Sequence, residues 1–230
     1  MSEALIAEGV SLVKAAGEAG LVLRLLGGAA IVLHSGGQPH RELGDLDAAT
    51  RRSDARRLAQ VLTAAGYEPE PRFNALHGDR RLIFHGPHGK LDVFVEVFEM
   101  CHRIDLGPRL PLDSPTLSVS DLLLTKLQVV ELNAKDVEDA ALLLCAHRLG
   151  RGEGDQVDLE YLAALVAHDW GLWRTLSGTL KRLEELRPDV AEPARSLRNA
   201  LDEAPKSRRF RMRAKVGERK RWYELPDEVG

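Results

Sequence analysis

Residues 23–50 read LRLLGGAAIVLHSGGQPHRELGDLDAAT, and this stretch decides the fold. The apolar run at 21–26 predicts a short buried strand, which the glycine pair Gly27-Gly28 brings to an end. The residues that follow favour a turn of helix and then a loop that contains two glycines and a proline. A second strand is expected at 45–49, so a strand, a glycine turn, a helix and a strand follow one another.

Helical patterns flank this stretch and dominate the rest of the chain. Apolar residues recur at helical spacing before it, and Ser53 follows it in the position of a helix cap. Beyond residue 115 the pattern is helical almost throughout. The expected helices cover residues 3–19, 54–65, 119–132, 134–148, 158–168, 170–186 and 190–203.

A β-hairpin is predicted between the two groups of helices. The β-rich runs 80–85 and 90–98 are separated by Gly-Pro-His-Gly at 86–89, which favours a turn. The second run, KLDVFVEVF, alternates in polarity, so Asp92 faces away from its two apolar neighbours. We therefore expect the α+β class: a small mixed β-sheet with helices on one side, followed by a helical region.

The C-terminal segment is strongly basic. Residues 206–221 contain nine Lys and Arg and one Glu, a local charge of +8 in a chain of net charge −3, which leaves −11 for the rest. Such a segment predicts contact with an anion, either an RNA backbone or the acidic body of the chain itself. Its basic residues alternate with apolar ones, which predicts an extended strand that turns at Gly217. Trp222 and Tyr223 could then stack on a base.

The composition is that of a soluble globular protein, with 44% hydrophobic and 29% charged residues. No apolar run approaches the roughly 20 residues that cross a bilayer, so we expect no membrane partner. The two cysteines, Cys101 and Cys145, lie far apart, so we expect reduced thiols and a cytoplasmic location. Neither cysteine has a spacing to histidine that is typical of structural zinc.

Three aspartates carry the chemistry that the sequence predicts. Asp45 and Asp47 lie two apart on an expected strand, so both carboxylates project from one face. Asp92 is a carboxylate on an otherwise apolar strand. Three converging carboxylates repel one another unless a cation joins them, and Mg²⁺ prefers carboxylates together with substrate phosphates. Gly27-Gly28, at a turn into a helix, would let the backbone approach a phosphate.

At this point the chain resembles a known superfamily, the DNA polymerase β-like nucleotidyltransferases. The string at 23–50 looks like its strand, GG, helix and DxD signature, and KLDVF looks like its third carboxylate strand. Downstream, LSVSDLLLTKLQVVELNAKDVEDAALLL resembles the minimal bacterial nucleotidyltransferases of the abortive-infection (AbiEii-like) toxin type. The resemblance covers about residues 20–148. With the helical pattern beyond residue 115 and the charge of the C-terminal segment, we expect a catalytic domain at 1–115, a helical domain at 116–205 and a basic tail at 206–230.

The resemblance also implies roles for individual residues. Asp45, Asp47 and Asp92 match the metal triad, which would hold two Mg²⁺ ions or Mn²⁺ in their place. Gly27 and Gly28 match the turn that holds the triphosphate, although many members have serine at the second position. Lys126 matches a helix lysine that contacts the triphosphate, and either Asp136 or Asp139 matches the acidic residue that follows it. Arg41 would touch a phosphate, orient Asp45 or lie on the surface of a loop.

The reaction that the resemblance implies is nucleotidyl transfer. An acceptor hydroxyl would attack the α-phosphorus of an NTP and release pyrophosphate. RNA, specifically tRNA, is the expected acceptor, and a toxin would act with an antitoxin partner. Two alternatives stay open: an antibiotic nucleotidyltransferase that modifies an aminoglycoside or a lincosamide, and a non-catalytic relative that binds a nucleotide.

Overall fold

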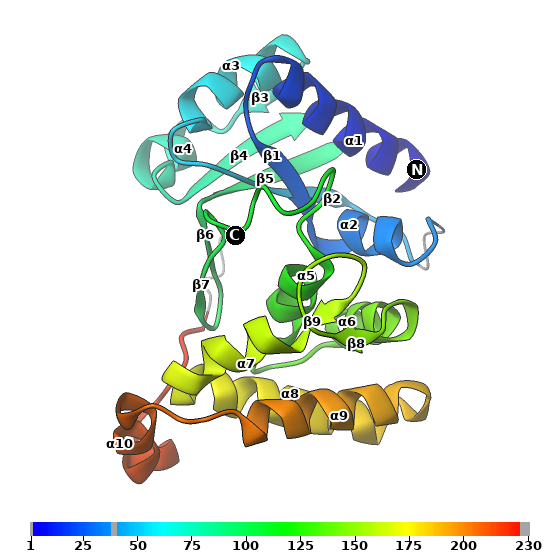
Figure 1. Cartoon of the computed structure of the whole chain (residues 1–230). Helices are drawn as coiled ribbons and strands as arrows, with labels where there is room; N and C mark the ends of the chain where they lie inside the picture. Colours follow the sequence, from blue (N-terminus) through cyan, green and yellow to red (C-terminus); the bar gives the residue numbers. More distant parts are fainter. Residues whose placement is uncertain (1, 38–40, 226–230) are drawn as a thin grey trace. The chain divides into compact units, whose positions relative to one another are not determined.

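The chain divides into two compact units in the computed structural model, which describes residues 2–37 and 41–225 (Figure 1). The first unit holds the residues up to Phe98 together with Ile104–Ser118. The second holds Glu99–Arg103 and the chain from Val119 onward. We describe each unit by itself.

The first unit is built around a five-stranded mixed sheet with the strand order β1-β2-β5-β4-β3. Strands β2 and β5 are parallel, and the other neighbouring strands are antiparallel. The prediction of a mixed sheet in an α+β fold is therefore confirmed. The strands are β1 (Leu23–Leu26), β2 (Asp45–Thr50), β3 (Glu68–Pro69), β4 (Arg81–Gly86) and β5 (Gly89–Val95).

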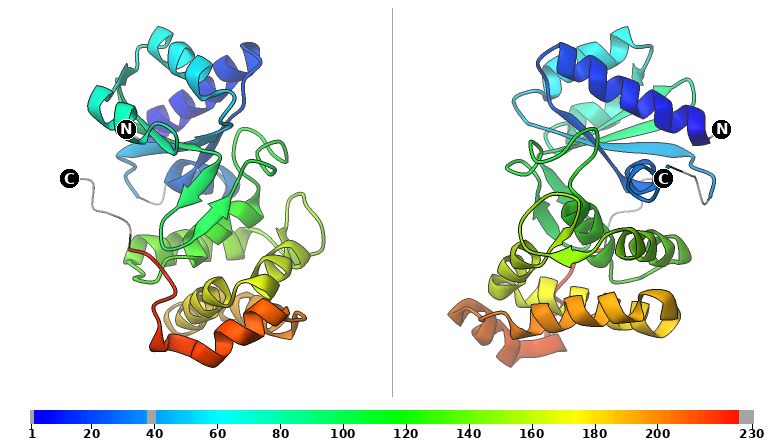
Figure 2. Two further views of the ribbon diagram at one scale, coloured as in Figure 1. Left: turned by 90° about the vertical axis from the view of Figure 1, so that its left-hand side faces the viewer. Right: turned by 45° about the vertical axis from the view of Figure 1, so that its right-hand side comes forward.

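Helices α1 and α3 lie over one face of this sheet, as two views show (Figure 2). Helix α1 comes close to the strands at Gly9, where an added Cβ would lie 3.2 Å from side-chain carbons of Leu25 and Leu46. Both leucines are fully buried. The apolar half of the alternating strand pattern therefore faces α1. The helices of this unit are α1 (Ser2–Glu18), α2 (Gly27–His34), α3 (Ala55–Ala64) and α4 (Pro71–His77).

Two local predictions in the first unit are wrong. Ser53 does not cap α3, because Asp54 is the N-cap residue and uses its Oδ2 to accept a hydrogen bond from the amide of Val22 at 2.9 Å. The alternation expected through residue 98 breaks at Glu96, which has a φ of +69°. The chain turns there into a separate hairpin of β6 (Val97–Glu99) and β7 (Arg103–Asp105).

The second unit is mainly helical, as its apolar periodicity predicted. Asn133, Asp158 and Asp169 each cap a helix with a side-chain oxygen that accepts from the backbone of the first turn. The helix expected at 119–132 ends five residues earlier, at Leu127. The elements are α5 (Val119–Leu127), α6 (Ala134–Ala146), β8 (Leu149–Gly150), β9 (Val157–Asp158), α7 (Leu159–His168), α8 (Trp170–Leu186), η1 (Pro188–Val190) and α9 (Ala191–Glu203).

The basic segment forms a helix, which contradicts the predicted β-like tail. Helix α10 (Arg208–Val216) is followed by the short helix η2 (Gly217–Arg219). Ser207 caps α10 by accepting a hydrogen bond from the amide of Phe210 at 3.1 Å. Phe210 is the one residue of α10 that is buried, whereas Met212 and Val216 are exposed. The alternation of basic and apolar residues therefore does not reflect a strand with one buried face.

No helix within the described residues is long and apolar enough to cross a membrane.

Candidate active site on the mixed sheet

The parallel pairing of β2 with β5 brings the three predicted carboxylates together. Asp47 is the Cα partner of Asp92, and Asp45 is the Cα partner of Lys90. Partners in a ladder project from the same face, and residues two apart on a strand do likewise. Asp45, Asp47 and Asp92 therefore share the sheet face opposite to the leucines that α1 covers.

Asp92 is buried, with 2% of its surface exposed, and two cations hold it. Nη2 of Arg81 lies 2.9 Å from its Oδ1, and Nζ of Lys90 lies 2.8 Å from its Oδ2. The guanidinium of Arg81 also lies over the rings of Phe73 and Phe94, at 5.9 and 5.3 Å from their centroids. A buried carboxylate is costly unless it is paired, and these two cations supply the pairing.

The sequence reasoning missed Arg81 and Lys90. Lys90 precedes Asp92 by two residues on the same strand, so the alternation that placed Asp92 also places Lys90 on its face. Arg81 is the partner of Phe94 across the β4–β5 hairpin. The turn at 86–89 fixes that register, and counting back from it leads to Arg81.

The glycine turn lies directly against Asp47. Gly27 begins α2 with a φ of +64°, and an added Cβ there would lie 2.2 Å from Oδ2 of Asp47. Such a separation is far below any van der Waals contact. The carboxylate therefore occupies the space that a side chain at position 27 would need. Both this contact and the positive φ require glycine at this position.

Arg41 lies at the same turn. A Cβ added to Gly28 would lie 2.9 Å from Nη2 of Arg41 and 2.8 Å from Cδ2 of Leu43. The guanidinium thus covers Gly28 beside the start of α2. Of the predicted site residues, the first unit brings together Gly27, Gly28, Arg41, Asp45, Asp47 and Asp92.

The other predicted site residues meet within the second unit. Lys126 on α5 lies 2.9 Å from Oδ2 of Asp139 and 3.4 Å from Oδ1 of Asp136, both on α6. Asp139 has no exposed surface, and the side chain of Lys126 is 15% exposed. The sequence left open which aspartate belongs with the lysine, and in the structure both contact it.

This face of the sheet can present carboxylate oxygens to a hard cation and backbone amides to an anion. Asp45 is exposed and Asp47 is half-buried, so their side chains lie at the accessible part of the face. The first turn of α2 begins beside them, and the free amides of a helix N-terminus favour negative charge. Such a combination suits a phosphate ligand that carries a divalent ion.

Comparison with known proteins identifies one family. The family described as "Uncharacterised nucleotidyltransferase" matches residues 2–187. No curated protein matches the chain. The abortive-infection toxin type that the sequence resembles stays a prediction.

Several solved structures are similar to the chain. An antigenic nucleotidyltransferase-like protein from Paracoccidioides brasiliensis is 17% identical over 88% of this chain and 94% of that one, with a TM-score of 0.48. The antibiotic-resistance factor ANT(2'')-Ia is 16% identical over 62% and 84%, with a TM-score of 0.46. The lincosamide adenylyltransferase LnuA, in its lincomycin-bound form, is 18% identical over 56% and 89%, with a TM-score of 0.39.

Proposed function

Because the chain belongs to this family of uncharacterised nucleotidyltransferases, we propose that it transfers a nucleoside monophosphate from an NTP to an acceptor hydroxyl. Asp45, Asp47 and Asp92 would hold the Mg²⁺ that this chemistry requires. The observation that carries the proposal is the register of β2 and β5, which sets Asp47 beside Asp92 on adjacent parallel strands. Asp45 adds a third carboxylate on the same face.

The donor set fits Mg²⁺ by its chemistry. Mg²⁺ is held by one or two carboxylates while substrate phosphates and water complete its coordination. Asp45 and Asp47 can supply these, and Mn²⁺ accepts the same ligands. Arg81 and Lys90 hold Asp92 in place beside the other two carboxylates. When bound, one or two ions would neutralise the triphosphate and the departing pyrophosphate.

The chain's own groups would bind and orient the triphosphate. The amides at the start of α2 would face the anion, and Gly27 and Gly28 would allow it to approach the backbone. Arg41, beside Gly28, offers a planar guanidinium that can donate two parallel hydrogen bonds to a phosphate. The acceptor oxygen would bond to the α-phosphorus as the bond to pyrophosphate breaks, and a carboxylate of the face would take the hydroxyl proton. A contact of Lys126 with the triphosphate stays a prediction.

RNA is the acceptor that the basic charge of helix α10 favours. Helix α10 presents Arg208, Arg209, Arg211 and Lys215 as exposed cations, and a row of exposed cations suits a polyanionic backbone. A small cationic antibiotic is the second candidate, which the acidic charge of the remaining chain favours. Modification of tRNA would stop translation, so a toxin role, with an antitoxin to restrain it, would follow from this chemistry.

The test is transfer of label in vitro. The full chain is incubated with Mg²⁺ and each labelled NTP, and with either total RNA or a panel of aminoglycosides and lincosamides. Asp45→Asn and Asp47→Asn should each lower labelling by roughly 100-fold or more, as losses of transition-state electrostatic stabilisation do. Asp79→Asn, an exposed position of the same unit, is the matched control. Asp92 is less suitable, because its replacement would also leave Arg81 and Lys90 without their partner.

Each outcome decides between the candidates. RNA labelled by the wild type and the control, but not by the two variants, supports the proposal. Label on drugs alone would overturn the RNA acceptor and leave the reaction type standing. Absence of label from every acceptor, with NTP binding retained in the two variants, would favour a non-catalytic relative.

A further inference from the structure

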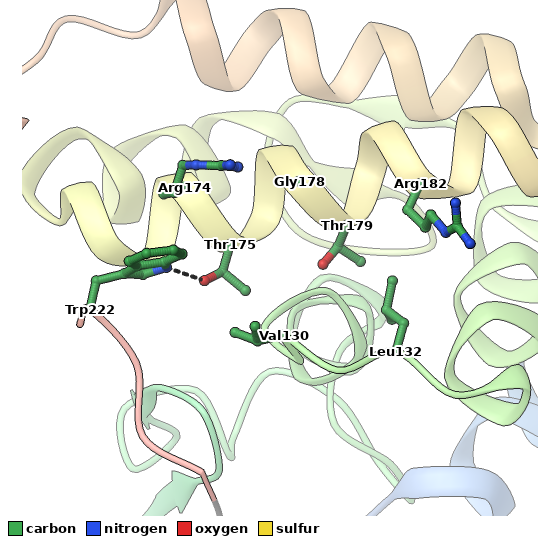
Figure 3. A pocket seen from close by; sticks show the side chains of 8 residues that line it. All are labelled: Val130, Leu132, Arg174, Thr175, Gly178, Thr179, Arg182 and Trp222. Carbon is green, nitrogen blue, oxygen red and sulfur yellow. Dashed lines mark hydrogen bonds between the residues drawn. The ribbon is translucent and has the colours of Figure 1, made fainter. Parts of the chain in front are cut away.

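A pocket of about 360 Å³ lies entirely within the helical second unit, far along the chain from the aspartates of the sheet. One wall is α8, which contributes Arg174, Thr175, Thr179 and Arg182. Val130 and Leu132 form the wall opposite, and Trp222 stands at one end (Figure 3). We propose that this pocket binds a nucleoside monophosphate. The site is independent of the proposed transfer reaction.

Two arginines give the pocket its charge. Arg174 and Arg182 line it, and among the lining residues that the structure describes there is no aspartate or glutamate. Their acidic partners lie outside the lining: Oε1 of Glu218 is 2.6 Å from Nε of Arg174, and Oε2 of Glu185 is 3.4 Å from Nη1 of Arg182. The Arg182–Glu185 pair is more than half exposed on both sides, and exposed pairs contribute little. A phosphate can therefore replace Glu185 at low cost and gain a bidentate contact.

The absence of a side chain at Gly178 lets the guanidinium of Arg174 lie close to the backbone of α8. An added Cβ at this position would lie 3.2 Å from Nη1 of Arg174. The guanidinium thus extends along α8 over the glycine, and its Nε is the atom that Glu218 takes. Figure 3 shows the side chain of Arg174 running along α8 in the direction of Gly178, on the other edge of the helix from Thr175 and Thr179.

The indole of Trp222 is fixed by its own contacts. Its Nε1 donates to Oγ1 of Thr175 at 3.1 Å, and its ring meets that of Trp170 edge to face at 5.8 Å. Thr175 in turn is hydrogen-bonded to Nε2 of His102 at 2.8 Å. A rigid aromatic side chain offers a planar apolar surface without a large entropic cost on binding.

These features together select the class of ligand. Trp222 and Arg182 lie at opposite ends of the groove, with the two threonines between them (Figure 3). A planar ring can pack against Trp222 and Val130 while a phosphate reaches Arg182. The volume is at the small end of ligand pockets, which suits a mononucleotide better than a dinucleotide or a coenzyme. Arg174 lies at the Trp222 end, with its Cζ 5.9 Å from the centroid of that ring, so the guanidinium of Arg182 meets the phosphate, and a single guanidinium matches a monophosphate better than a triphosphate.

The experiment is calorimetric titration of the full chain with AMP, CMP, GMP or UMP in a buffer that contains EDTA. We expect binding of at least one of the four. Arg182→Gln and Arg174→Gln should each weaken it at least tenfold. Lys181→Gln removes the same charge from the adjacent, exposed position of α8, outside the pocket lining, and should leave binding unchanged. Asp47→Asn should also leave it unchanged, which separates this site from the proposed NTP site.

Three results would overturn the proposal. One is the absence of binding by any of the four mononucleotides at millimolar concentration. Another is binding that Asp47→Asn removes while the two arginine variants retain it. The third is equal affinity for the tightest-binding mononucleotide and for inorganic phosphate, which would show that no ring packs against Trp222. Circular dichroism of each variant confirms that a lost signal reflects the pocket rather than unfolding.

Discussion

At the scale of single residues, the close approach of Gly27 to Asp47 requires a residue without a side chain at position 27. Gly27 has a φ of +64° and its missing Cβ leaves the space that the Asp47 carboxylate fills. We predict that Gly27→Ala lowers the free energy of unfolding by about 1–2 kcal/mol through the left-handed backbone alone. The displaced carboxylate should additionally weaken Mg²⁺–NTP binding. Urea denaturation and calorimetric titration measure the two effects.

Gly20 supplies a matched control for this substitution. Its φ is +70°, and nothing lies within 4 Å of a Cβ added there. Gly20→Ala therefore carries the same conformational cost without the clash, and it should lose stability while binding the nucleotide normally. Normal binding by Gly27→Ala, or equally impaired binding by Gly20→Ala, would contradict the role given to the Gly27–Asp47 contact.

The second glycine of the turn shows how a departure from the family pattern can be accommodated. Many nucleotidyltransferases that the sequence resembles have serine at this position, where this chain has Gly28. A side chain there would meet the ends of Arg41 and Leu43, at 2.9 and 2.8 Å. Arg41 therefore fills the place that a serine side chain would take, and its guanidinium can donate to a phosphate as a hydroxyl would.

Lys126 forms ion pairs with two carboxylates, so its replacement affects stability as well as any contact with a nucleotide. Its ammonium contacts Asp136 and the fully buried Asp139, so removal of the lysine would take from a buried carboxylate the cation that lies 2.9 Å away. Breaking a buried ion pair in this way is strongly destabilising. A loss of activity on replacing Lys126 would therefore not by itself indicate contact with the triphosphate.

At the scale of elements, the tip of the β6–β7 hairpin is attached to α8 through His102. Its Nε2 lies 2.8 Å from Oγ1 of Thr175, and its backbone amide donates to the fully buried Gln128 at 2.7 Å. Burial lowers the pKa of His102, and Asp169 partly opposes that shift. The unfolded chain therefore takes up a proton at this histidine at higher pH than the folded chain does.

This difference predicts acid sensitivity with a definite sign. The contribution of His102 to the free energy of unfolding should be constant above the ordinary histidine pKa of about 6.5. It should fall as the pH drops below that value, until the pKa of the folded state is reached. His102→Gln keeps a polar group of similar reach but cannot titrate. We expect the variant to lose less stability than the wild type between pH 7.5 and pH 5.5, measured by urea denaturation. Equal losses in both proteins would exclude His102 as the source.

Sequence reasoning found the features that local patterns determine. It missed those that depend on contacts between residues far apart in the sequence. Alternation along a strand placed Asp45, Asp47 and Asp92 correctly, because a period of two fixes the face of each residue without knowledge of the rest of the fold. The break at Glu96 depends on distant partners: its amide donates to the carbonyl of Thr50, and its own carbonyl accepts from Leu106. No local pattern carries that information.

The tail was assigned the wrong element for the same reason. Its alternation of cations with apolar residues fits a strand, but only Phe210 is buried on α10. Phe210 meets Trp173 at 5.6 Å, and Arg213 lies 4.5 Å from the ring centroid of Trp170. These aromatic contacts join residues about 40 positions apart, and they decide the conformation of the segment.

At the scale of the whole molecule, the separation of charge is the feature that bears on the acceptor. The cations of 206–221 are divided between two roles. Arg213 donates to the carbonyls of Gly217 and Lys220, and Arg219 donates to those of Lys215 and Val216, so both stabilise the fold of the segment. Arg208, Arg209 and Arg211 are exposed, and no such intramolecular contact engages them in the described part of the chain. Together with the exposed Lys215, they are the cations that a polyanion would meet.

We predict that replacing these three arginines with glutamine weakens binding of single-stranded RNA and flattens its salt dependence. Each phosphate contact contributes about 0.7 to the slope of log K against log salt, so three contacts should lower the slope by about 2. The control replaces Lys14, Arg56 and Arg72, three exposed cations of the first unit, and so changes the net charge equally. Filter binding over a range of salt concentrations measures both proteins. An unchanged slope in the arginine variant would show that α10 does not contact RNA and would favour the antibiotic acceptor. An equal change in the control would show that total charge, and not α10, sets the salt dependence.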